Sequence, residues 1–432
     1  MDQSNWKIAV IGMGYVGMPL AIAFAKHYNV VGYDIDTEKI RKYQNNIDPT
    51  GEIGTEKLKK TSLKFSSDEN DISDANFYII TVPTPIKQDN TPNLRPIESA
   101  THLVGQHVNR GDYIVYESTV YPGVTEDVCV PLLEQASGLK SPNQFKVGYS
   151  PERINPGDQQ NTVENIIKIV SGIDQEALEV ISNIYGKVIK AGIHKASTIK
   201  VAESAKVVEN SQRDINIAFM NELSQVFNLM DVNTHEVIEA MNTKWNALGF
   251  YPGLVGGHCI GVDPYYFIYQ AENLGYHSQI ISAGRKINNE MPEFVVQNLV
   301  KNLMKQNKSS DSNVVIAGLT FKENTPDFRN SKVIDMIQSL NSYGIRPKVI
   351  DPYVKHYPDE IHADIIEFED IDFPVDVLLY AVNHKQFVDI NNDEFLKILS
   401  RDASLVIDLK NRFGKSKKTI WNIGLFNRRL FE

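Results

Sequence analysis

Cysteine is scarce in this chain of 432 residues, which carries only Cys129 and Cys259. Two cysteines are too few for a disulfide framework or a structural zinc site, so we expect a reducing compartment, the cytoplasm, and no bound metal. Long hydrophobic runs are also missing. No apolar stretch approaches the ~18 residues of a membrane span, and residues 1–7 lack the pattern of a secretion signal, so no membrane association is expected.

Positive charge is in deficit as well. The chain has 44 Lys and Arg against 54 Asp and Glu, a formal net charge of -10. This balance argues against nucleic acid as a partner, and an anionic ligand must be held by local donors. The content of 42% hydrophobic and 23% charged residues is ordinary for a soluble globular chain, and the length predicts roughly two to four domains.

The first motif is a glycine-rich turn between an apolar strand and a helix. A buried strand is predicted over 6–11, the turn Gly12-Met-Gly-Tyr-Val-Gly17 follows, a helix is predicted over 18–28, and a second strand over 30–34 ends in Asp34. Gly12 permits the tight turn, Gly14 lets a pyrophosphate approach, and Gly17 packs helix against strand. This βαβ unit predicts dinucleotide binding; the alternative is a glycine turn without a ligand.

Asp34 indicates which dinucleotide to expect. Its carboxylate suits a pair of ribose hydroxyls and would repel a 2′-phosphate, so NAD is favoured over NADP, although Asp36 could share this task. The cofactor contacts predicted in this unit are Gly12, Met13, Gly14, Tyr15, Val16, Gly17, Asp34 and Lys39.

Polar turns follow three further predicted strands, over 76–82, 113–117 and 145–149. These turns carry Thr84, Thr119 and Glu152. Because the ligand crevice of an open parallel sheet lies at the carboxyl ends of its strands, all three side chains are candidates for lining the cofactor site. Taken singly, each is more often a turn or helix-cap residue.

The middle of the chain is helical. No proline interrupts the pattern from 196 to 241, and Lys206, Asn210 and Arg213 fall on one helical face. Such a stripe normally faces water, but apolar residues on several sides indicate a helix buried between domains. Since a buried lysine needs a partner or a task, Lys206 and Asn210 are candidate site residues.

A sheet pattern then restarts. A helix over 292–305 leads to a polar linker over 306–313, and strands are predicted over 314–318, 347–351, 377–382 and 405–408, with helices such as 331–343 and 393–399 between them. This second α/β region has no G-x-G-x-x-G, but its Lys322 and Arg329 could pair with phosphate or carboxylate. The basic tail over 415–429 is predicted to be a solvated surface.

Cys259 lies in a glycine-rich stretch, residues 251–266, between the helical middle and the second sheet pattern. The glycines let a ligand approach the backbone closely. Asp263, followed by Pro264, is expected to cap a helix beside the thiol. The alternative is that Cys259 is a small core residue, as most unpaired cysteines are.

These patterns predict an α/β fold with two Rossmann-like, doubly wound domains joined by a long-helix central domain. Ordered motifs also cover nearly the whole chain: Gly12 to Gly17, Pro83-Thr-Pro85, Glu117-Ser-Thr119, Ser150-Pro-Glu-Arg153, Lys206 with Asn210, Asn221-Glu222, Gly256-Gly-His-Cys259 with Asp263, and Phe321-Lys322 with Asp327 and Arg329. With these motifs the chain resembles the nucleotide-sugar 6-dehydrogenases, the UDP-glucose/GDP-mannose 6-dehydrogenase family.

The resemblance implies a four-electron oxidation of a sugar C6 alcohol to a carboxylate, with two NAD⁺ and one water. Cys259 would carry a thiohemiacetal and then a thioester. The catalytic residues implied are Cys259, Lys206, Asn210, Asp263, Thr119 and Glu152. The domains implied are 1–195 for NAD, 196–305 for the central helices and 306–432 for the UDP-sugar. A homodimer through the long helix is expected, although packing within one chain would explain the same apolar helix.

Two positions separate this chain from the UDP-glucose branch, which has a lysine at Val262 and a serine at His258. The block 244–259 is similar to the branch that oxidises UDP-N-acetylhexosamines, so UDP-N-acetylglucosamine or UDP-N-acetylgalactosamine is expected; no spacing distinguishes these C4 epimers. The substrate contacts implied are Glu152, Arg153, Lys206, Asn210, Phe250, Tyr251, Gly253, Gly256, Gly257, Lys322 and Arg329. Thr84, Thr119 and Arg329 also belong to the predicted cofactor set.

Other hypotheses stay open at this point. The substrate could be UDP-glucose or UDP-N-acetylmannosamine. A single-step hydroxyacid dehydrogenase would use Lys206 and Asn210 but not Cys259, and it would form one NADH per substrate instead of two. In a non-catalytic NAD-binding or assembly protein, Cys259, Asp263 and Lys206 would be incidental.

Overall fold

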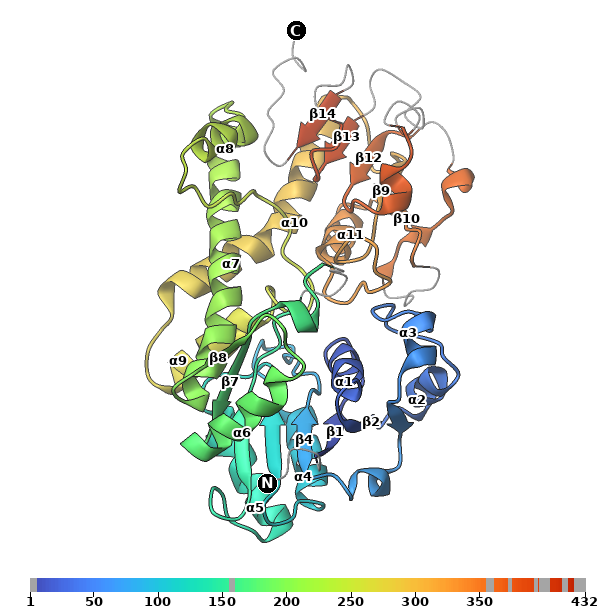
Figure 1. Ribbon diagram of the computed structural model, residues 1–432. Helices are drawn as coiled ribbons and strands as arrows, with labels where there is room; N and C mark the ends of the chain where they lie inside the picture. The colour runs from blue at the N-terminus through green and yellow to red at the C-terminus, as the bar shows by residue number, and fades with distance from the viewer. Residues whose placement is uncertain are drawn as a thin grey trace. The chain divides into compact units, whose positions relative to one another are not determined.

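The computed structural model describes residues 6–154, 160–354, 361–371, 375–391, 395, 405–413 and 419–422. The chain forms two compact units, one made of Met1–Asn210 with Tyr265–His277 and the other of Ser211–Pro264 with Ser278–Glu432. Each unit holds one β-sheet (Figure 1). The three domain boundaries expected from the sequence stay a prediction.

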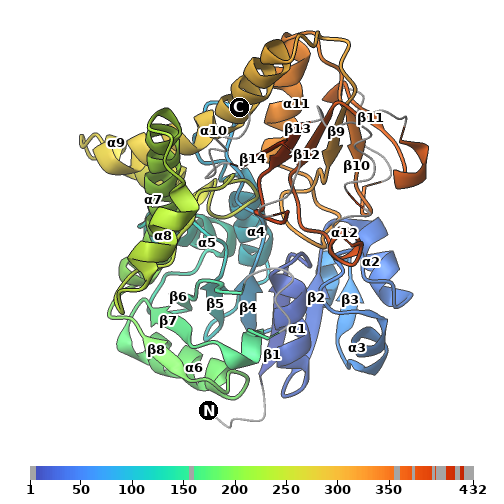
Figure 2. The same cartoon turned by 90° about the horizontal axis from the view of Figure 1, so that it is seen from above.

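The sheet of the first unit has the strand order β3-β2-β1-β4-β5-β6-β7-β8 (Figure 2). Neighbouring strands are parallel except for the antiparallel pair β6 and β7. The strands are β1 (Lys7–Ile11), β2 (Asn29–Tyr33), β3 (Lys64–Ser66), β4 (Phe77–Ile80), β5 (Tyr113–Tyr116), β6 (Lys146–Tyr149), β7 (Lys168–Gly172) and β8 (Ile193–Lys195). The five strands predicted in this part of the chain are present, whereas the sequence pattern missed β3, β7 and β8.

Helices cover both faces of this sheet. Ile8 and Val10 of β1 point into a core with α1 and α6, while Ala9 and Ile11 point into a core with α4 and α5. The helices are α1 (Gly17–Ala25), α2 (Thr37–Gln44), α3 (Thr55–Lys60), α4 (Arg95–Gly105), α5 (Val130–Ser137) and α6 (Gln175–Gly186), with short turns η1 (Glu69–Ile72), η2 (Thr125–Cys129) and η3 (Val163–Asn165). Strands buried on both faces explain the continuous apolar runs in the sequence.

The sheet of the second unit is entirely parallel, in the order β11-β10-β9-β12-β13-β14 (Figure 2). Its strands are β9 (Val314–Ala317), β10 (Lys348–Ile350), β11 (Asp364–Ile365), β12 (Val377–Tyr380), β13 (Leu405–Asp408) and β14 (Thr419–Asn422). One face packs on α10 (Gln279–Lys305) and α11 (Lys332–Ser342), and the other on an aromatic cluster with α12 (Lys385–Val388); η5 spans Phe368–Asp370. In both sheets the first strand lies between the second and the fourth, which confirms the doubly wound prediction and puts a ligand crevice at the carboxyl ends of these strands.

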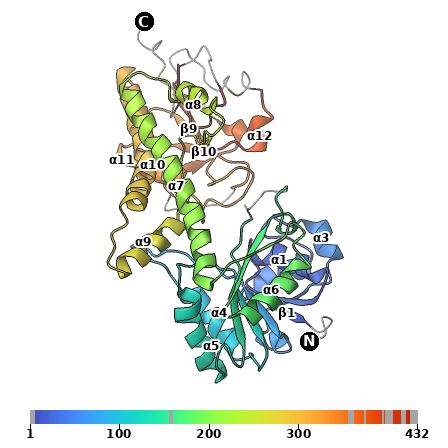
Figure 3. The ribbon, with the colours of Figure 1, turned by 60° about the vertical axis from the view of Figure 1, so that its left-hand side comes forward.

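The central helices differ in detail from the prediction. The long helix is α7 (Ile199–Leu229), unbroken in Figure 3, and α8 (Thr234–Asn242) follows after a turn at 230–233. Asp231 has φ +56°, and the Asn233 side chain caps α8 by accepting from the His235 and Glu236 N–H groups. The expectation of one helical stretch to residue 241 was therefore wrong, because an asparagine cap starts a new helix there.

Two helix starts were also predicted wrongly. The helix expected to begin at Pro292 is α10, which starts at Gln279 and contains that proline in its interior. Pro292 is buried, and the packing of the helix outweighs the missing backbone hydrogen bond. Helix α9 (Asp263–Asn273) begins at Asp263 itself, so this residue stands in the first turn instead of the cap position.

The C-terminal expectations are met in part. The predicted helix over 393–399 lies outside the described residues except for Phe395, which is buried. Residues 419–422 of the tail expected to be solvated form β14, an edge strand paired with β13, and the solvation of this segment stays a prediction; the tail's other residues lie outside the described part. In the part of the chain that the structure describes, no helix is both long and apolar enough to cross a membrane.

Candidate functional site

The turn after β1 has the shape that a dinucleotide needs. Gly12 has φ +98°, and a Cβ there would lie 3.1 Å from the Val82 backbone nitrogen. A Cβ on Gly17 would overlap the Gly12 carbonyl oxygen, so only glycine lets α1 approach β1 this closely. At Gly14, in contrast, a Cβ would meet nothing within 4 Å. The tight turn and the open backbone at Gly14 fit a pyrophosphate at the start of α1.

Asp34 is anchored at the end of β2. One carboxylate oxygen accepts from the Met13 N–H at 2.8 Å and from Lys39 Nζ at 2.8 Å, and the other accepts from the Asp36 N–H at 2.9 Å. The Asp36 side chain instead caps α2 through the Lys39 N–H. The Met13 side chain is fully buried, so this residue can offer only its backbone to a ligand. Tyr15, on the same turn, is half-buried.

The turns after β4 and β5 are joined to each other. Thr84 Oγ1 donates to the Thr119 carbonyl at 2.6 Å, and Ser118 Oγ donates to the Val82 carbonyl at 2.7 Å. Tyr266 of α9 donates its hydroxyl to the Thr84 carbonyl at 2.5 Å. Thr84 and Thr119, predicted separately, are thus brought together at the carboxyl edge of the first sheet.

Glu152 belongs to a buried ionic cluster. Lys168 Nζ lies 2.5 Å from a carboxylate oxygen of Glu117 and 3.2 Å from one of Glu152, and the Tyr185 hydroxyl donates to Glu117 at 2.6 Å. Burial raises the pKa of Glu117 to about 7, although Lys168 opposes this rise. The other Glu152 oxygen accepts from the N–H groups of the next two residues, and the Arg153 side chain is exposed.

Sequence reasoning missed Lys168 and Tyr185. They lie 51 and 68 positions from Glu117, and only the fold brings them together. The one signal in the sequence is a lysine that opens the apolar run Lys168-Ile-Val-Ser-Gly172, because a lysine in a buried strand requires a carboxylate partner.

Lys206 and Asn210 stand on the part of α7 that belongs to the first unit. Asn210 is buried, as expected. Lys206 was expected to be buried but is only half-buried. One turn earlier, the buried Glu203 accepts from the Gly123 N–H at 2.6 Å and the Thr125 N–H at 3.0 Å. This carboxylate fixes the segment that follows Thr119, and it was not predicted.

The two cysteines have opposite surroundings. Cys259 is exposed, whereas Cys129 is fully buried and burial raises its pKa to about 12. The alternative that Cys259 is a small core residue is therefore wrong. The Cys259 carbonyl accepts from the Val262 and Asp263 N–H groups at 3.0 and 2.8 Å, which closes a turn at the start of α9. Asp263 is buried.

The loop that carries Cys259 lies in the second unit and packs on the segment between β9 and α11. A Cβ on Gly256 would lie 2.6 Å from the Asn330 carbonyl, and one on Gly257, where φ is +81°, would lie 2.6 Å from the Phe321 ring. The His258 ring meets the same Phe321 edge-on, with ring centres 5.4 Å apart. Its Nε2 is 3.6 Å from Asp327, and burial lowers the pKa of His258. The two glycines are required by this close contact.

The buried side-chain amide of Asn221 holds Gly253, at the N-terminal end of the Cys259 loop. Asn221 of α7 accepts from the Gly253 N–H at 2.8 Å and donates to the Gly253 carbonyl at 2.9 Å and to Asn288 at 2.8 Å. Asn288 in turn donates to Asp214 at 2.7 Å, which pairs with Arg285 at 2.6 Å. This chain of buried groups fixes Gly253; only Asn221 had been noted as a motif residue. Phe250 is half-buried and Tyr251 is exposed.

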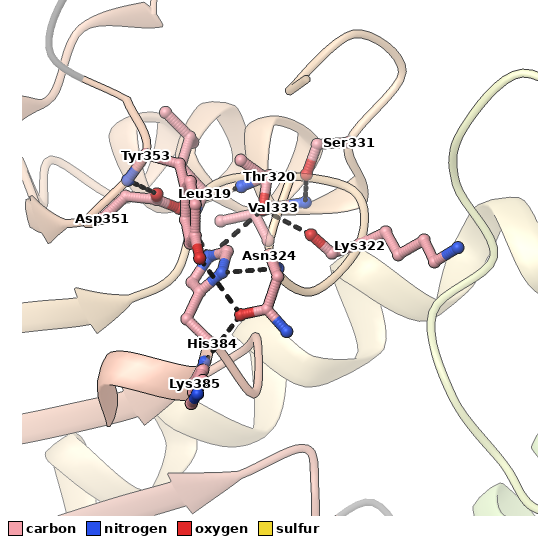
Figure 4. A network of polar contacts seen from close by, with 10 residues as sticks. All are labelled: Leu319, Thr320, Lys322, Asn324, Ser331, Val333, Asp351, Tyr353, His384 and Lys385. Atoms are coloured by element: carbon pink, nitrogen blue, oxygen red, sulfur yellow. Dashed lines mark hydrogen bonds and ion pairs between the residues drawn. The ribbon is translucent and has the colours of Figure 1, made fainter. Parts of the chain in front are cut away.

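The two predicted cationic contacts of the second unit lie on one segment. Arg329 pairs with Asp327 through Nε and Nη2 at 3.0 and 2.6 Å, and its side chain stays 64% exposed. Lys322 is half-buried, and its carbonyl accepts from Thr320 Oγ1 at 2.8 Å while its side chain extends away (Figure 4). Lys206 and Asn210 lie in the first unit, and Cys259, Asp263, Lys322 and Arg329 lie in the second.

Three consecutive parts of the chain match models of one protein family. Residues 6–189 match the NAD binding domain of the UDP-glucose/GDP-mannose dehydrogenase family, residues 200–290 its central domain, and residues 315–415 its UDP binding domain.

Single proteins with known names or structures are also similar to the chain. Protein CapL of Staphylococcus aureus is 47% identical over 409 residues, which are 94% of this chain and 96% of CapL. The UDP-N-acetyl-D-glucosamine 6-dehydrogenase of Pseudomonas aeruginosa is 45% identical over 424 residues, 96% of this chain and 99% of that protein. The solved structure of UDP-D-ManNAc dehydrogenase from Pyrococcus horikoshii matches with a TM-score of 0.87 at 31% identity, covering 97% of this chain and 99% of that one.

Proposed function

This chain belongs to the UDP-glucose/GDP-mannose dehydrogenase family, and on that premise we propose that it oxidises the C6 alcohol of UDP-N-acetylglucosamine to a carboxylate. The observation that carries the proposal is the exposed Cys259 on a loop packed against Phe321 and Asn330, in a unit whose residues 315–415 match a UDP binding domain. The choice of sugar follows the named relative in Pseudomonas aeruginosa.

The first oxidation needs a proton acceptor at the C6 hydroxyl. When bound, NAD⁺ takes up one hydride in each of the two oxidations. Asp263 and Thr119 hold the water that removes the hydroxyl proton, and the buried position of Asp263 fixes its carboxylate. Gly12, Gly14 and Asp34 are the residues that would hold the pyrophosphate and a ribose of the cofactor.

Cys259 makes the second oxidation possible. Its thiolate adds to the aldehyde carbon and forms a thiohemiacetal, and loss of a hydride from that carbon leaves a thioester. Lys206 and Asn210 donate to the oxyanion at this carbon; one such donor is typically worth about 3–4 kcal/mol. Water then adds, the carbon–sulfur bond breaks, the uronic acid leaves, and Glu152 accepts the proton of the water.

The buried cluster around Glu152 suits that last step. Lys168 and two backbone N–H groups hold the carboxylate in one orientation. A base held by such contacts keeps its lone pairs aimed in a fixed direction while the thioester is hydrolysed.

A substrate panel tests the proposal. We expect NADH formation with UDP-N-acetylglucosamine at a kcat/KM at least about tenfold above that with UDP-N-acetylgalactosamine, UDP-N-acetylmannosamine or UDP-glucose, since a site that hydrogen-bonds the sugar penalises a misplaced hydroxyl. A higher kcat/KM for UDP-glucose would contradict the branch assignment, and turnover of a small hydroxyacid with one NADH would favour the single-step alternative.

We also propose a homodimer formed through α7. Several apolar side chains of this helix are exposed on the single chain: Val201 48%, Val208 47%, Phe219 54%, Val226 44% and Leu229 85%. Val201, Val208, Phe219 and Val226 are spaced by 7, 11 and 7 residues, which puts them on one face of the helix, and an exposed apolar face of this kind is typical of a contact with another chain. In size-exclusion chromatography with light scattering, the protein should have twice the mass of one chain, and Phe219→Glu with Val226→Glu should halve it. A monomeric parent protein would rule this out.

The need for a reduced Cys259 thiol also bears on the cellular compartment of the enzyme. An exposed thiol that serves as a nucleophile must stay reduced, and we propose that the enzyme works in the cytoplasm.

A further inference from the structure

A buried histidine joins three strand ends of the second sheet. His384 follows β12, Thr320 follows β9 and Asp351 follows β10, and these are the neighbouring strands where the ligand crevice of such a sheet lies (Figure 4). The side chains of His384 and Asp351 are both 0% exposed. Nothing in the reaction proposed above uses this histidine.

The contacts of His384 determine which nitrogen carries its proton. Nδ1 accepts from the Asn324 N–H at 3.0 Å, so it carries no hydrogen. Nε2 lies 3.0 Å from an Asp351 carboxylate oxygen and 3.2 Å from Thr320 Oγ1, and it is the donor. His384 is thus a neutral imidazole that donates one hydrogen bond from Nε2 and accepts one at Nδ1. A residue that replaces it must do both to keep the network.

The segment held in this way is the loop that carries Lys322. Asp351 accepts from the Leu319 and Thr320 N–H groups at 2.6 and 3.2 Å. Asn324, with φ +57°, accepts at its side chain from the Lys385 N–H at 2.7 Å. Both ends of loop 319–324 are therefore bound to residues that follow β10 and β12, and an asparagine in the left-handed region stands at the far end.

The first unit uses the equivalent acid differently. Asp34 after β2 also accepts an N–H from the turn after the first strand, but its second partner is Lys39, whose side chain is 29% exposed. Asp351 stands at the same place after β10 and is sealed by His384. Both acids hold the turn after the first strand of their sheet, but Asp34 has a partly exposed lysine as its partner, whereas Asp351 is enclosed by a buried histidine.

We propose that His384 is a positioning residue for the nucleotide end of the substrate: through Asn324 and Asp351 it fixes loop 319–324 so that the Lys322 ammonium meets the diphosphate. This inference rests on the proposed function and on the assignment of Lys322 to the UDP-sugar, which the family resemblance implies. A diphosphate needs a cation at a defined place, and a lysine on a loose loop loses affinity because the loop must be ordered on binding.

Two isosteric variants separate the two hydrogen bonds. His384→Gln keeps a donor near Nε2 and removes the acceptor for the Asn324 N–H, whereas His384→Asn keeps an acceptor near Nδ1. We expect the Kd for UDP and the KM for UDP-N-acetylglucosamine to rise about tenfold in His384→Gln, and less in His384→Asn, with kcat and the Kd for NAD⁺ unchanged. Gln386→Ala, an exposed neighbour outside the network, is the matched control and should behave as the parent.

Hydrogen–deuterium exchange measures the order of loop 319–324 directly, even if a variant loses stability. Faster exchange in His384→Gln should be confined to peptides that contain 319–324. If Lys322→Ala weakens UDP binding but both His384 variants bind UDP and exchange like the parent, the positioning role is wrong while the proposed function stands. If Lys322→Ala binds UDP like the parent, the assignment of Lys322 fails, and the inference fails with it.

Discussion

Among single residues, the contrast between the two cysteines carries the most chemistry. Cys259 is exposed and Cys129 is buried with its pKa raised to about 12. Cys259→Ser should lower uronic acid formation by at least about 10³-fold, as expected when a covalent nucleophile is lost. Cys129→Ala, the matched control, should keep turnover. The measurement is NADH formation with purified protein, and a serine variant with normal acid yield would exclude the thioester.

Glu203 gives the residue-level prediction for pH. Burial raises its pKa from 4.5 to about 7, so the folded state holds this proton more tightly than the unfolded state does. The resulting stabilisation is full below pH 4.5 and is lost as the pH rises to about 7, in total roughly 3 kcal/mol. Glu203→Gln should therefore make the fall of Tm between pH 5 and 7 less steep. Burial also raises the pKa of Glu117, so Glu117 contributes to this fall in the same direction.

The control for this prediction is Glu56→Gln on α3, an exposed carboxyl that should leave the pH dependence of Tm as it is in the parent. A Glu203→Gln protein whose Tm falls with pH as steeply as that of the parent would show that this carboxyl ionises alike in both states.

Among helices and strands, the junction of β1 and α1 gives the sharpest test. Gly17→Ala places a Cβ against the Gly12 carbonyl and should lower Tm by several degrees, the effect of overpacking by about 1–3 kcal/mol. Gly14→Ala meets open space, so its Tm should be that of the parent while its Kd for NAD⁺ rises at least about tenfold. Calorimetry and cofactor titration distinguish the two; equal behaviour of both variants would contradict the assigned roles.

The sequence predicts elements well where one local rule decides them. The sequence runs that form β1, β4 and β12 are apolar on both faces, so their pattern predicts buried strands. The glycines before α1 are required by the steric limits of the turn, so their pattern predicts the turn. Local rules failed where packing or a cap decided: Pro292 stays inside α10, and Asn233 starts α8.

The candidate site divides in the same way. Cys259, Asp34 and Lys322 stand in recognisable motifs and could be named from the sequence. Lys168 has only one signal in the sequence, its position at the start of an apolar run, and His384 was not noted at all, because each becomes significant through a carboxylate 51 or 33 positions away. A buried ion pair or histidine leaves at most a weak local pattern, so the supporting residues of a site are the ones that the sequence shows least clearly.

For the whole chain, two sheets that share the order of their first six strands match domains with different tasks. The first matches an NAD binding domain and the second a UDP binding domain, which confirms the predicted cofactor and the resemblance to nucleotide-sugar dehydrogenases. The difference lies in the turns: an open glycine backbone with Asp34 in one sheet, and a loop held by Asp351 and His384 in the other.

In the proposed mechanism, one enzyme oxidises an alcohol to an acid through an intermediate bound to Cys259. The most direct test of this mechanism is to consume a limiting amount of UDP-N-acetylglucosamine with excess NAD⁺ and to count the NADH formed per sugar. Two NADH per sugar, with the uronic acid as the product, is the predicted result. One NADH per sugar, with the aldehyde released, would exclude this mechanism.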